Sequence, residues 1–406
     1  MNLTSAISKR NYYSLLWHAG FLAFASNFID VDTIIPAMMA DAGGTAMHIG
    51  ILTAIMLGGS SFTQLIFAPF ISNFEFKKKF LLSGISARIL ALLLLGILLL
   101  YSSRIEGHYE IALLFVLITI FSVGGAFANI SFTDILGKSL LESSRKPFFS
   151  IRLVVNGIIL FGSAFLARYV LNSEGYPLNY SRMFFIGFMA LAVASLGFWN
   201  IKEVVPSKMT VKNPSHFLLI IRNELKENKK LIYFLGFVNT MGISSALLPF
   251  MILYAKENFV ANEISTGNLL LFKVIGGVLT GLLLFLISRK FKYRGLLYLN
   301  TSLALIAPLL MLLIPSIPTL HVVFFLGGIV FASYTITMNG VLLEVSGRTN
   351  RALYTGIAGA GNILPAIFPL LGGLLVQHFG FLPFLFLFIA IILFSFFFIH
   401  RLQCSK

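Results

Sequence analysis

The sequence contains a single cysteine, Cys404, and few charged residues, and each scarcity excludes a class of protein. One cysteine cannot form an intramolecular disulfide or a zinc site built from several thiolates. Charged residues make up 11% of the chain, whereas a typical soluble domain has about 25%. Disorder is excluded as well, because disordered chains have few aromatic residues and this sequence has 42 phenylalanines.

Apolar residues take the place of the missing charges, at 58% of the chain, with a mean hydropathy of +0.91. They gather in runs close to the roughly 20 residues that a helix needs to cross a bilayer. The sequence therefore predicts an all-α membrane protein with twelve transmembrane helices. The expected spans are 13–38, 47–72, 80–101, 110–137, 148–171, 183–201, 231–254, 265–288, 295–316, 319–344, 352–376 and 380–400.

The basic residues indicate the orientation of these spans. Of the 30 Lys and Arg residues, 23 fall on the side that holds both termini, 4 fall on the other side, and the remaining 3 lie inside predicted spans. Because cytoplasmic loops carry such an excess, we expect both termini in the cytoplasm and a multi-pass protein of a bacterial inner (plasma) membrane. The net charge of +15 is then a topology signal that requires no nucleic acid. The first span is too long for a signal-peptide core and should stay in the mature protein.

One long hydrophilic stretch, residues 202–230, divides the chain. We expect an N-terminal six-helix bundle in residues 1–201 and a C-terminal six-helix bundle in residues 231–406. The stretch between them should form a cytoplasmic linker with an amphipathic helix on the membrane surface. A regulatory binding site is the alternative role for this linker.

The two halves also resemble each other in sequence. At an offset of 213 residues, Phe24 aligns with Phe237 and Pro36 aligns with Pro249. Parallel six-helix halves related by an axis along the membrane normal are one way in which secondary transporters are built. Glycine pairs such as 124–125, 276–277 and 327–328 indicate close packing between helices.

Over almost its whole length the sequence resembles the major facilitator superfamily. The shared features are the six-plus-six count of spans, the long central loop, and the basic turns NFEFKKKFLL and RKFKYRGLLY after the second and eighth spans. Of the family motif after the second helix, only the basic part is present, at Lys77 to Lys79. The fifth span lacks the glycine–proline motif of the drug/proton antiporters. The resemblance implies two pseudo-symmetric six-helix bundles, with Glu344 and Arg351 in an inner gate that closes in the outward-open state.

Ionisable side chains inside the spans are the first candidates for function, because each costs about 2.5–3.5 kcal/mol on insertion scales. Asp30 is expected well inside the first helix, with Asp32 about 200° further around it, so only one of them should face a transport pathway. A carboxylate in a water-poor cavity can take up and release a proton near neutral pH. Asp30 is thus a candidate for proton coupling or for binding a cationic group; a buried structural pair with a basic residue is the alternative.

Lys273 is a second candidate, placed roughly 13 Å into the eighth span. Its counterpart in the first half falls near Gly58, so the charge belongs to one half only. This asymmetry favours binding of an anionic group or a coupling role over maintenance of the fold. The alternative is that Lys273 serves as the counter-ion of Asp30 or Asp32.

Three further charges, Asp134, Arg152 and Glu344, are expected near the cytoplasmic ends of their spans. Lys138 follows Asp134 at the stabilising i,i+4 spacing, and Arg152, at the start of the fifth span, is expected to reach Asp134. We interpret these residues as gate and ion-pair residues, with direct substrate contact as the alternative. The uncharged cavity candidates are Asn239, Ser244 and Tyr334, for which hydrogen bonding between helices is the alternative role.

These features predict a secondary active transporter that moves a small organic solute with an anionic group by alternating access, coupled to protons. We expect it to act as a monomer, with the solute, protons and membrane lipid as partners and with no cofactor, metal or nucleic acid. Proton antiport of amphipathic cationic drugs through Asp30 is the alternative. A membrane-embedded enzyme is a weaker one, because the seven histidines are scattered without ligand spacing.

Overall fold

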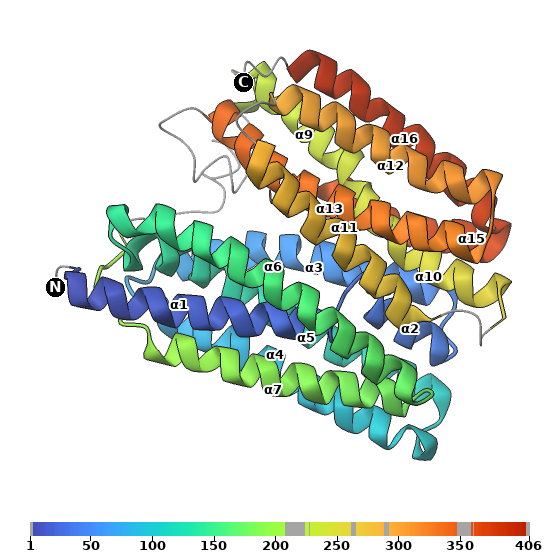
Figure 1. Ribbon diagram of the computed structural model, residues 1–406, viewed down its shortest axis with the longest axis horizontal. Helices are drawn as coiled ribbons and strands as arrows, with labels where there is room; N and C mark the ends of the chain where they lie inside the picture. Colours follow the sequence, from blue (N-terminus) through green and yellow to red (C-terminus); the bar gives the residue numbers. More distant parts are fainter. Residues whose placement is uncertain are drawn as a thin grey trace. The chain divides into compact units, whose positions relative to one another are not determined.

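The computed structural model describes residues 3–207, 224–226, 228–260, 265–287, 292–346, 359 and 361–402. Within these residues every regular element is a helix (Figure 1). The first six predicted spans correspond to α1 (Ser5–Ser26), α2 (Ile34–Asp41), α3 (Ala46–Ser72), α4 (Lys78–Leu100), α5 (Gly107–Ser139), α6 (Glu142–Ser173) and α7 (Leu178–Asn200). A short 3-10 helix, η1 (Ser102–Arg104), lies between α4 and α5.

The last six predicted spans correspond to α9 (Lys229–Gly242), η2 (Ile243–Ala246), α10 (Leu247–Asn258), α11 (Thr266–Ile287), α12 (Tyr293–Leu313), α13 (Ile317–Ser346), α15 (Ile363–Phe379) and α16 (Phe381–Leu402). In the described part of the chain, nine helical stretches are long and apolar enough to cross a membrane, and residues 46–59 and 363–379 form shorter apolar helices. The start of the span predicted at 352–376 and most of the predicted linker, including its amphipathic helix, lie outside the described residues.

The first predicted span is not one continuous helix. Helix α1 ends at Ser26 and α2 begins at Ile34, so Asp30 and Asp32 lie in the break between them. The prediction that Asp30 lies inside a helix is therefore wrong, and the expected 200° separation does not apply. Pro36 explains why no regular helix runs through Asp32, because a proline has no N–H to bond to the carbonyl four residues earlier.

Helix α6 begins six residues before the predicted span, at Glu142, so Arg145 belongs to its first turns rather than to a loop. The Arg145 side chain donates hydrogen bonds to the carbonyl oxygens of Gly137 at 2.6 Å and Leu140 at 3.3 Å. These carbonyls belong to the end of α5, where the last C=O groups have no helical partners and the helix dipole favours a cation. Arg145, in the first turn of α6, therefore caps the C-terminal end of α5.

The helices group into two compact units. Unit 1 comprises Met1–Asp30 and Gly59–Pro214, and unit 2 comprises Val31–Gly58 and Ser215–Lys406. These units are defined by packing, and they differ from the expected sequence halves because residues 31–58 belong to unit 2. In unit 2, α2 packs against α10 and α11.

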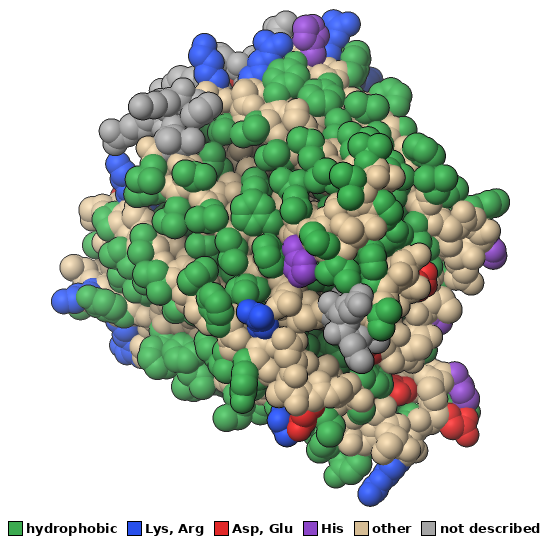
Figure 2. Space-filling view, turned by 45° about the vertical axis from the view of Figure 1, so that its right-hand side comes forward, with side chains coloured by type: hydrophobic (Ala, Val, Ile, Leu, Met, Phe, Trp, Pro, Cys, Tyr) green, Lys and Arg blue, Asp and Glu red, His purple; other side chains and the backbone are tan. Residues whose placement is uncertain are grey.

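In unit 1, α4 packs between α5 and α7, and α1 packs against α6 and α7 (Figure 1). Glycines allow the closest of these approaches: a Cβ added to Gly84 of α4 would lie 2.6 Å from the carbonyl oxygen of Gly124 in α5. In unit 2, a Cβ on Gly328 of α13 would overlap the Lys273 carbonyl oxygen of α11. The glycine pairs therefore pack helices closely, as predicted. Hydrophobic side chains cover most of the face shown in Figure 2, as a lipid-facing surface requires.

Candidate functional site

Asp32 and Lys273 form a buried ion pair in unit 2. The Nζ of Lys273 lies 2.5 Å from Oδ2 of Asp32, and each side chain is 10% exposed. Lys273 comes from α11, and its Nζ also lies 5.9 Å from the ring centre of Phe331 on α13. A buried charge is costly unless it is paired, and the two side chains compensate each other here. The sequence left Asp30 and Asp32 open as partners of Lys273, and Asp32 lies within ion-pair distance of it.

A cavity of about 170 Å³ lies beside this pair, with Asp32 in its wall. Helix α13 supplies Phe331, Tyr334 and Thr335 to its lining. Together with Gly327 these residues follow an i, i+4, i+7, i+8 spacing, which places them on one face of the helix. Each cavity-lining residue belongs to unit 2.

The other polar residues of the wall come from places where helices are interrupted. Ser244 and Ser245 lie in η2, a short 3-10 stretch between α9 and α10, and Asn362 lies immediately before α15. The Ser245 hydroxyl donates to the carbonyl oxygen of Gly242 at 2.7 Å. Interruptions of transmembrane helices are tolerated where they line a cavity, and they commonly mark transport sites.

Two of the uncharged candidates, Ser244 and Tyr334, line this cavity, but Asn239 does not. The Asn239 amide oxygen accepts the backbone N–H groups of Ile363 at 3.1 Å and Leu364 at 2.8 Å, and its Nδ2 donates to Gly361 at 2.7 Å. Asn239 thus satisfies unpaired donors at the start of α15. Its contacts are those of the helix–helix alternative, and they position the segment that carries Asn362.

Sequence reasoning missed Phe331, Thr335 and Asn362. Phe331 and Thr335 could have been predicted from the sequence, because they lie on the same face of the helix as Tyr334. Asp30 is half-buried in the break after α1, belongs to unit 1, and does not line the cavity.

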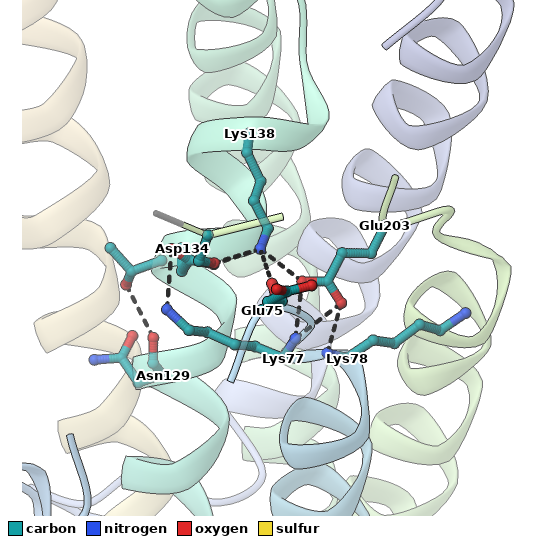
Figure 3. A network of polar contacts seen from close by, with 9 residues as sticks. Glu75, Lys77, Lys78, Asn129, Asp134, Lys138 and Glu203 are labelled. Atoms are coloured by element: carbon teal, nitrogen blue, oxygen red, sulfur yellow. Dashed lines mark hydrogen bonds and ion pairs between the residues drawn. The ribbon is translucent and has the colours of Figure 1, made fainter. Parts of the chain in front are cut away.

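A second polar cluster lies in unit 1, where α4 begins and α5 ends (Figure 3). Asp134 lies 2.8 Å from Nζ of Lys138, the pair expected from their spacing, and 3.1 Å from Nζ of Lys77. Glu203 lies 2.8 Å from the same Lys138 ammonium. The Glu203 carboxylate also accepts the backbone N–H groups of Lys77 and Lys78, each at 2.8 Å. One carboxylate therefore joins the start of α4 to the end of α5.

Arg152 does not join this cluster, contrary to expectation. Because α6 begins at Glu142, Arg152 lies ten residues into the helix rather than at its start. Its Cζ lies 5.8 Å from the ring centre of Phe132. Glu344 lies in the last turn of α13, and Arg351, its expected gate partner, lies outside the described residues. Among the described residues, no group of three or more His, Cys, Asp or Glu side chains could hold a metal ion.

The family model of the Major Facilitator Superfamily matches residues 16–324 and 232–402, and the chain therefore belongs to this family. None of the curated proteins matches the sequence. A mutant of the nucleoside transporter NupG shares the fold at 14% identity and a TM-score of 0.67, over 98% of this chain and 100% of that chain. A POT family transporter in complex with a thioalcohol-conjugated peptide gives 12% identity and a TM-score of 0.70, over 97% of each chain.

The xylose transporter XylE from E. coli, in an inward-open conformation, gives 11% identity and a TM-score of 0.65, over 97% of this chain and 96% of that chain. At such identities the likeness shows the fold. The predicted fold class, an all-α membrane protein with the fold of the major facilitator superfamily, is confirmed. The chain is a multi-pass membrane protein and a secondary transporter, not an enzyme.

Proposed function

We propose that this transporter moves a small organic solute with an anionic group, by alternating access and coupled to protons. The observation that supports this most directly is the Asp32–Lys273 ion pair beside the cavity in unit 2. Lys273 is the cationic member of the pair, and Asp32 is the member that lines the cavity. Whatever neutralises Asp32 therefore removes one counter-charge from the Lys273 ammonium, which lies beside the cavity wall.

The coupling step is an exchange of partners on Lys273. A proton from solution binds the Asp32 carboxylate, which loses its negative charge and so breaks its ion pair with the Lys273 ammonium. The anionic group of the solute then takes the place of Asp32 on Lys273. Because one positive and one negative charge are buried before and after the exchange, the proton and the solute anion bind together and leave together.

The rest of the cavity favours a small, partly apolar solute. Ser244, Tyr334 and Asn362 offer hydrogen-bond donors and acceptors, and Phe331 offers an aromatic wall. Pockets of this kind bind the bulk of a ligand through apolar contacts and orient it through a few polar groups. Asn239 contributes indirectly because it holds the start of α15, next to Asn362.

Alternating access requires contacts that form in one state and break in another. Within unit 2, residues 31–58 are tied to the C-terminal helices by Asp32–Lys273 and by Asp41–Lys256, the latter at 2.6 Å. We propose that both pairs break when the pathway opens at this end. The Asp134 cluster would keep its part of unit 1 rigid during the motion, and Glu344 with Arg351 would form the gate on the cytoplasmic side.

Efflux of amphipathic cations by proton antiport is the second candidate. Two observations favour it: Asp30 is a half-buried carboxylate outside any helix, and the ring of Phe331 already faces a cation.

The distribution of basic residues supports placement in a bacterial inner membrane with both termini in the cytoplasm. We propose that the transporter acts as a monomer.

Thermal unfolding of the purified protein with a library of metabolites and drugs tests the proposal, because a ligand that binds only the folded state raises the midpoint. Anionic solutes should stabilise the wild type, and Lys273→Ala should abolish the shift. Lys256→Ala, which removes an ion pair of unit 2 whose residues do not line the cavity, is the matched control and should keep the shift. If only lipophilic cations stabilise the protein and Asp30→Asn removes their effect, efflux replaces anion transport.

A further inference from the structure

An apolar groove of about 440 Å³ lies on the surface of unit 1 and shares no residue with the cavity beside Asp32. Helix α1 supplies most of its lining and α6 supplies the rest. The lining residues are Tyr13, Leu16, Trp17, Gly20, Phe21, Phe24 and Ile159. Helix α1 lies between α6 and α7 and packs against both (Figure 1). None of these lining residues is charged, and none has a part in the proposed transport cycle.

Two residues of α1 shape the groove. Trp17 forms a wall: its Nε1 donates to the carbonyl oxygen of Val193 in α7 at 2.8 Å, and its ring centre lies 4.7 Å from that of Phe21. Gly20 has no side chain to fill the space between its neighbours, and a Cβ added there would lie 3.2 Å from Cδ1 of Ile159. Because a hydrogen bond fixes the indole, the groove is formed before any ligand binds.

The large side chains of the groove are exposed although they are apolar. Tyr13 is 59% exposed and Trp17 is 47% exposed. In a multi-pass membrane protein, an exposed apolar surface on a span faces lipid chains, and the first expected span begins at Tyr13. From Tyr13 to Phe24 the helix rises by about 16 Å. One leaflet of the hydrocarbon core is about 15 Å thick. The groove therefore matches the length of one acyl chain.

A basic residue extends the stripe at one end of the groove. Lys9 lies four residues before Tyr13 and eleven before Gly20, on the same face of α1. Its side chain is exposed, whereas the next residue, Arg10, already donates to the side chain of Asn200 at 2.6 Å. Lys9 precedes the expected span, at the level where lipid headgroups begin. Its ammonium is therefore placed to meet a phosphate at the end of the groove.

Helix α6 brings a second cation to this end. The Ser8 hydroxyl accepts the N–H of Leu141 at 3.0 Å, so α1 and α6 begin side by side. Near the start of α6, Lys146 is exposed, and so is Glu142, the acidic residue of its first turn. Lys9 and Lys146 outnumber this carboxylate. The end of the groove thus carries a positive charge that favours an anionic headgroup.

We propose that this groove binds one anionic phospholipid, with an acyl chain along α1 and the phosphate at Lys9. The apolar stripe recognises the chain and the lysine recognises the charge. A second copy of the protein is a poorer occupant. Two copies related by an axis along the membrane normal would bring their Lys9 residues to the same end of the interface, where like charges repel. The site is independent of the proposed transport cycle.

Tryptophan fluorescence can report whether the groove is occupied, because the sequence contains two tryptophans, Trp17 and Trp199. Trp199→Phe leaves Trp17 as the single emitter. Trp17→Phe leaves Trp199, which is 61% exposed on α7 and does not line the groove. Each full-length variant is placed in phosphatidylcholine nanodiscs with a small fraction of lipid whose acyl chains are brominated, since bromine quenches tryptophan on contact. The brominated lipid is phosphatidylglycerol in one series and phosphatidylcholine in the other.

Brominated phosphatidylglycerol should quench Trp17 more strongly than brominated phosphatidylcholine at the same mole fraction. Lys9→Gln should reduce this preference about fivefold, as expected for one lysine near anionic lipid, and should leave the quenching of Trp199 unchanged. Lys79→Gln is the matched control, because Lys79 is exposed at the start of α4, a helix that packs against α5 and α7. The preference at Trp17 should persist in this control.

Gly20→Val tests the groove separately from the charge. The valine side chain would occupy part of the groove, so both brominated lipids should quench Trp17 less. If Gly20→Val does not fold, Lys9→Gln decides alone, because Lys9 is exposed and its replacement disturbs no packing.

The proposal is overturned if the two brominated lipids quench Trp17 equally while Lys9 is present, or if Lys9→Gln keeps the full preference. It is also overturned if neither brominated lipid quenches Trp17, a result that would indicate a second copy or another segment of protein over the groove. Transport measurements do not enter this test, so its failure and the failure of the transport proposal are distinguishable.

Discussion

Lys273 and Asp32 are separated by 241 residues in the sequence, yet the ammonium of one lies 2.5 Å from the carboxylate of the other. Neither residue is surrounded by water, and both side chains are 10% exposed. The attraction between such buried charges is offset by their desolvation, so the pair need not stabilise the fold in total. Removing only one of the two residues has a different effect, because the remaining charge keeps its desolvation cost.

Removal of one partner should be more harmful than removal of both. Lys273→Met leaves the Asp32 carboxylate buried without this ammonium partner and should lower the free energy of unfolding by about 3–5 kcal/mol. Asp32→Asn combined with Lys273→Met should restore much of this loss. A double-mutant cycle of unfolding midpoints measures the coupling between the residues, and effects that simply add would show that they do not interact.

The proposed exchange on Lys273 makes solute binding depend on pH in a defined direction. Since a proton on Asp32 frees Lys273 for the solute, affinity for an anionic solute should fall as the pH rises, by up to about tenfold per pH unit for one proton per solute. Asp32→Asn should remove this dependence, because the neutral amide needs no proton. Isothermal binding measurements across a pH series check it, and an unchanged pH profile in Asp32→Asn would rule out Asp32 as the coupling group.

Asn239 should act on α15 rather than on the solute directly. Asn239→Ala leaves the N–H groups of Ile363 and Leu364 without their acceptor, which should cost about 1–2 kcal/mol of stability. Hydrogen exchange at residues 363–364 should become faster. Asn258→Ala is the control, since that amide bonds only to Tyr254 of its own helix, and exchange at 363–364 should not change there.

Glu203 should be the most sensitive residue of the cluster in unit 1. Its side chain is 3% exposed, and it serves both Lys138 and the backbone at the start of α4. Glu203→Ala should destabilise the protein by about 2–3 kcal/mol. Glu75→Ala should have little effect, because Lys138 bonds to the backbone carbonyl of Glu75. Comparable unfolding midpoints for the two variants would contradict this assignment.

The packing of α11 on α13 should control the position of Lys273. Gly328→Ala would push a methyl group into the Lys273 carbonyl oxygen, so the helices must separate and solute binding should weaken together with stability. In Gly281→Ala, on α11 itself, the added methyl group would have no atom within 4 Å. It should be neutral or stabilising by up to about 1 kcal/mol. Thermal unfolding and solute binding of the two variants give the comparison.

Hydropathy was sufficient to predict most of the helices, because a span of apolar residues is a property of the local sequence. The family was predicted from the basic turns and the long central loop together with the count of spans. The break after Ser26 was missed for the same reason: residues 27–33, four of which are polar, lie between apolar stretches that hydropathy joins into one span, and hydropathy does not report backbone geometry. The depth of Arg152 was misjudged because the polar first turn of α6 resembles a loop. Charge asymmetry identified Lys273 as a candidate, but its pairing depends on a tertiary contact that spacing alone cannot reveal.

The break between α1 and α2 is also a point at which the chain passes from unit 1 to unit 2. Residues 31–58 join unit 2, although the chain on both sides of them belongs to unit 1. Any motion that breaks the ion pairs of residues 31–58 must therefore change the backbone at two points in the chain. One is the non-helical stretch around Asp30, and the other is the Gly58–Gly59 pair within α3. We expect that stiffening either point slows the conformational cycle.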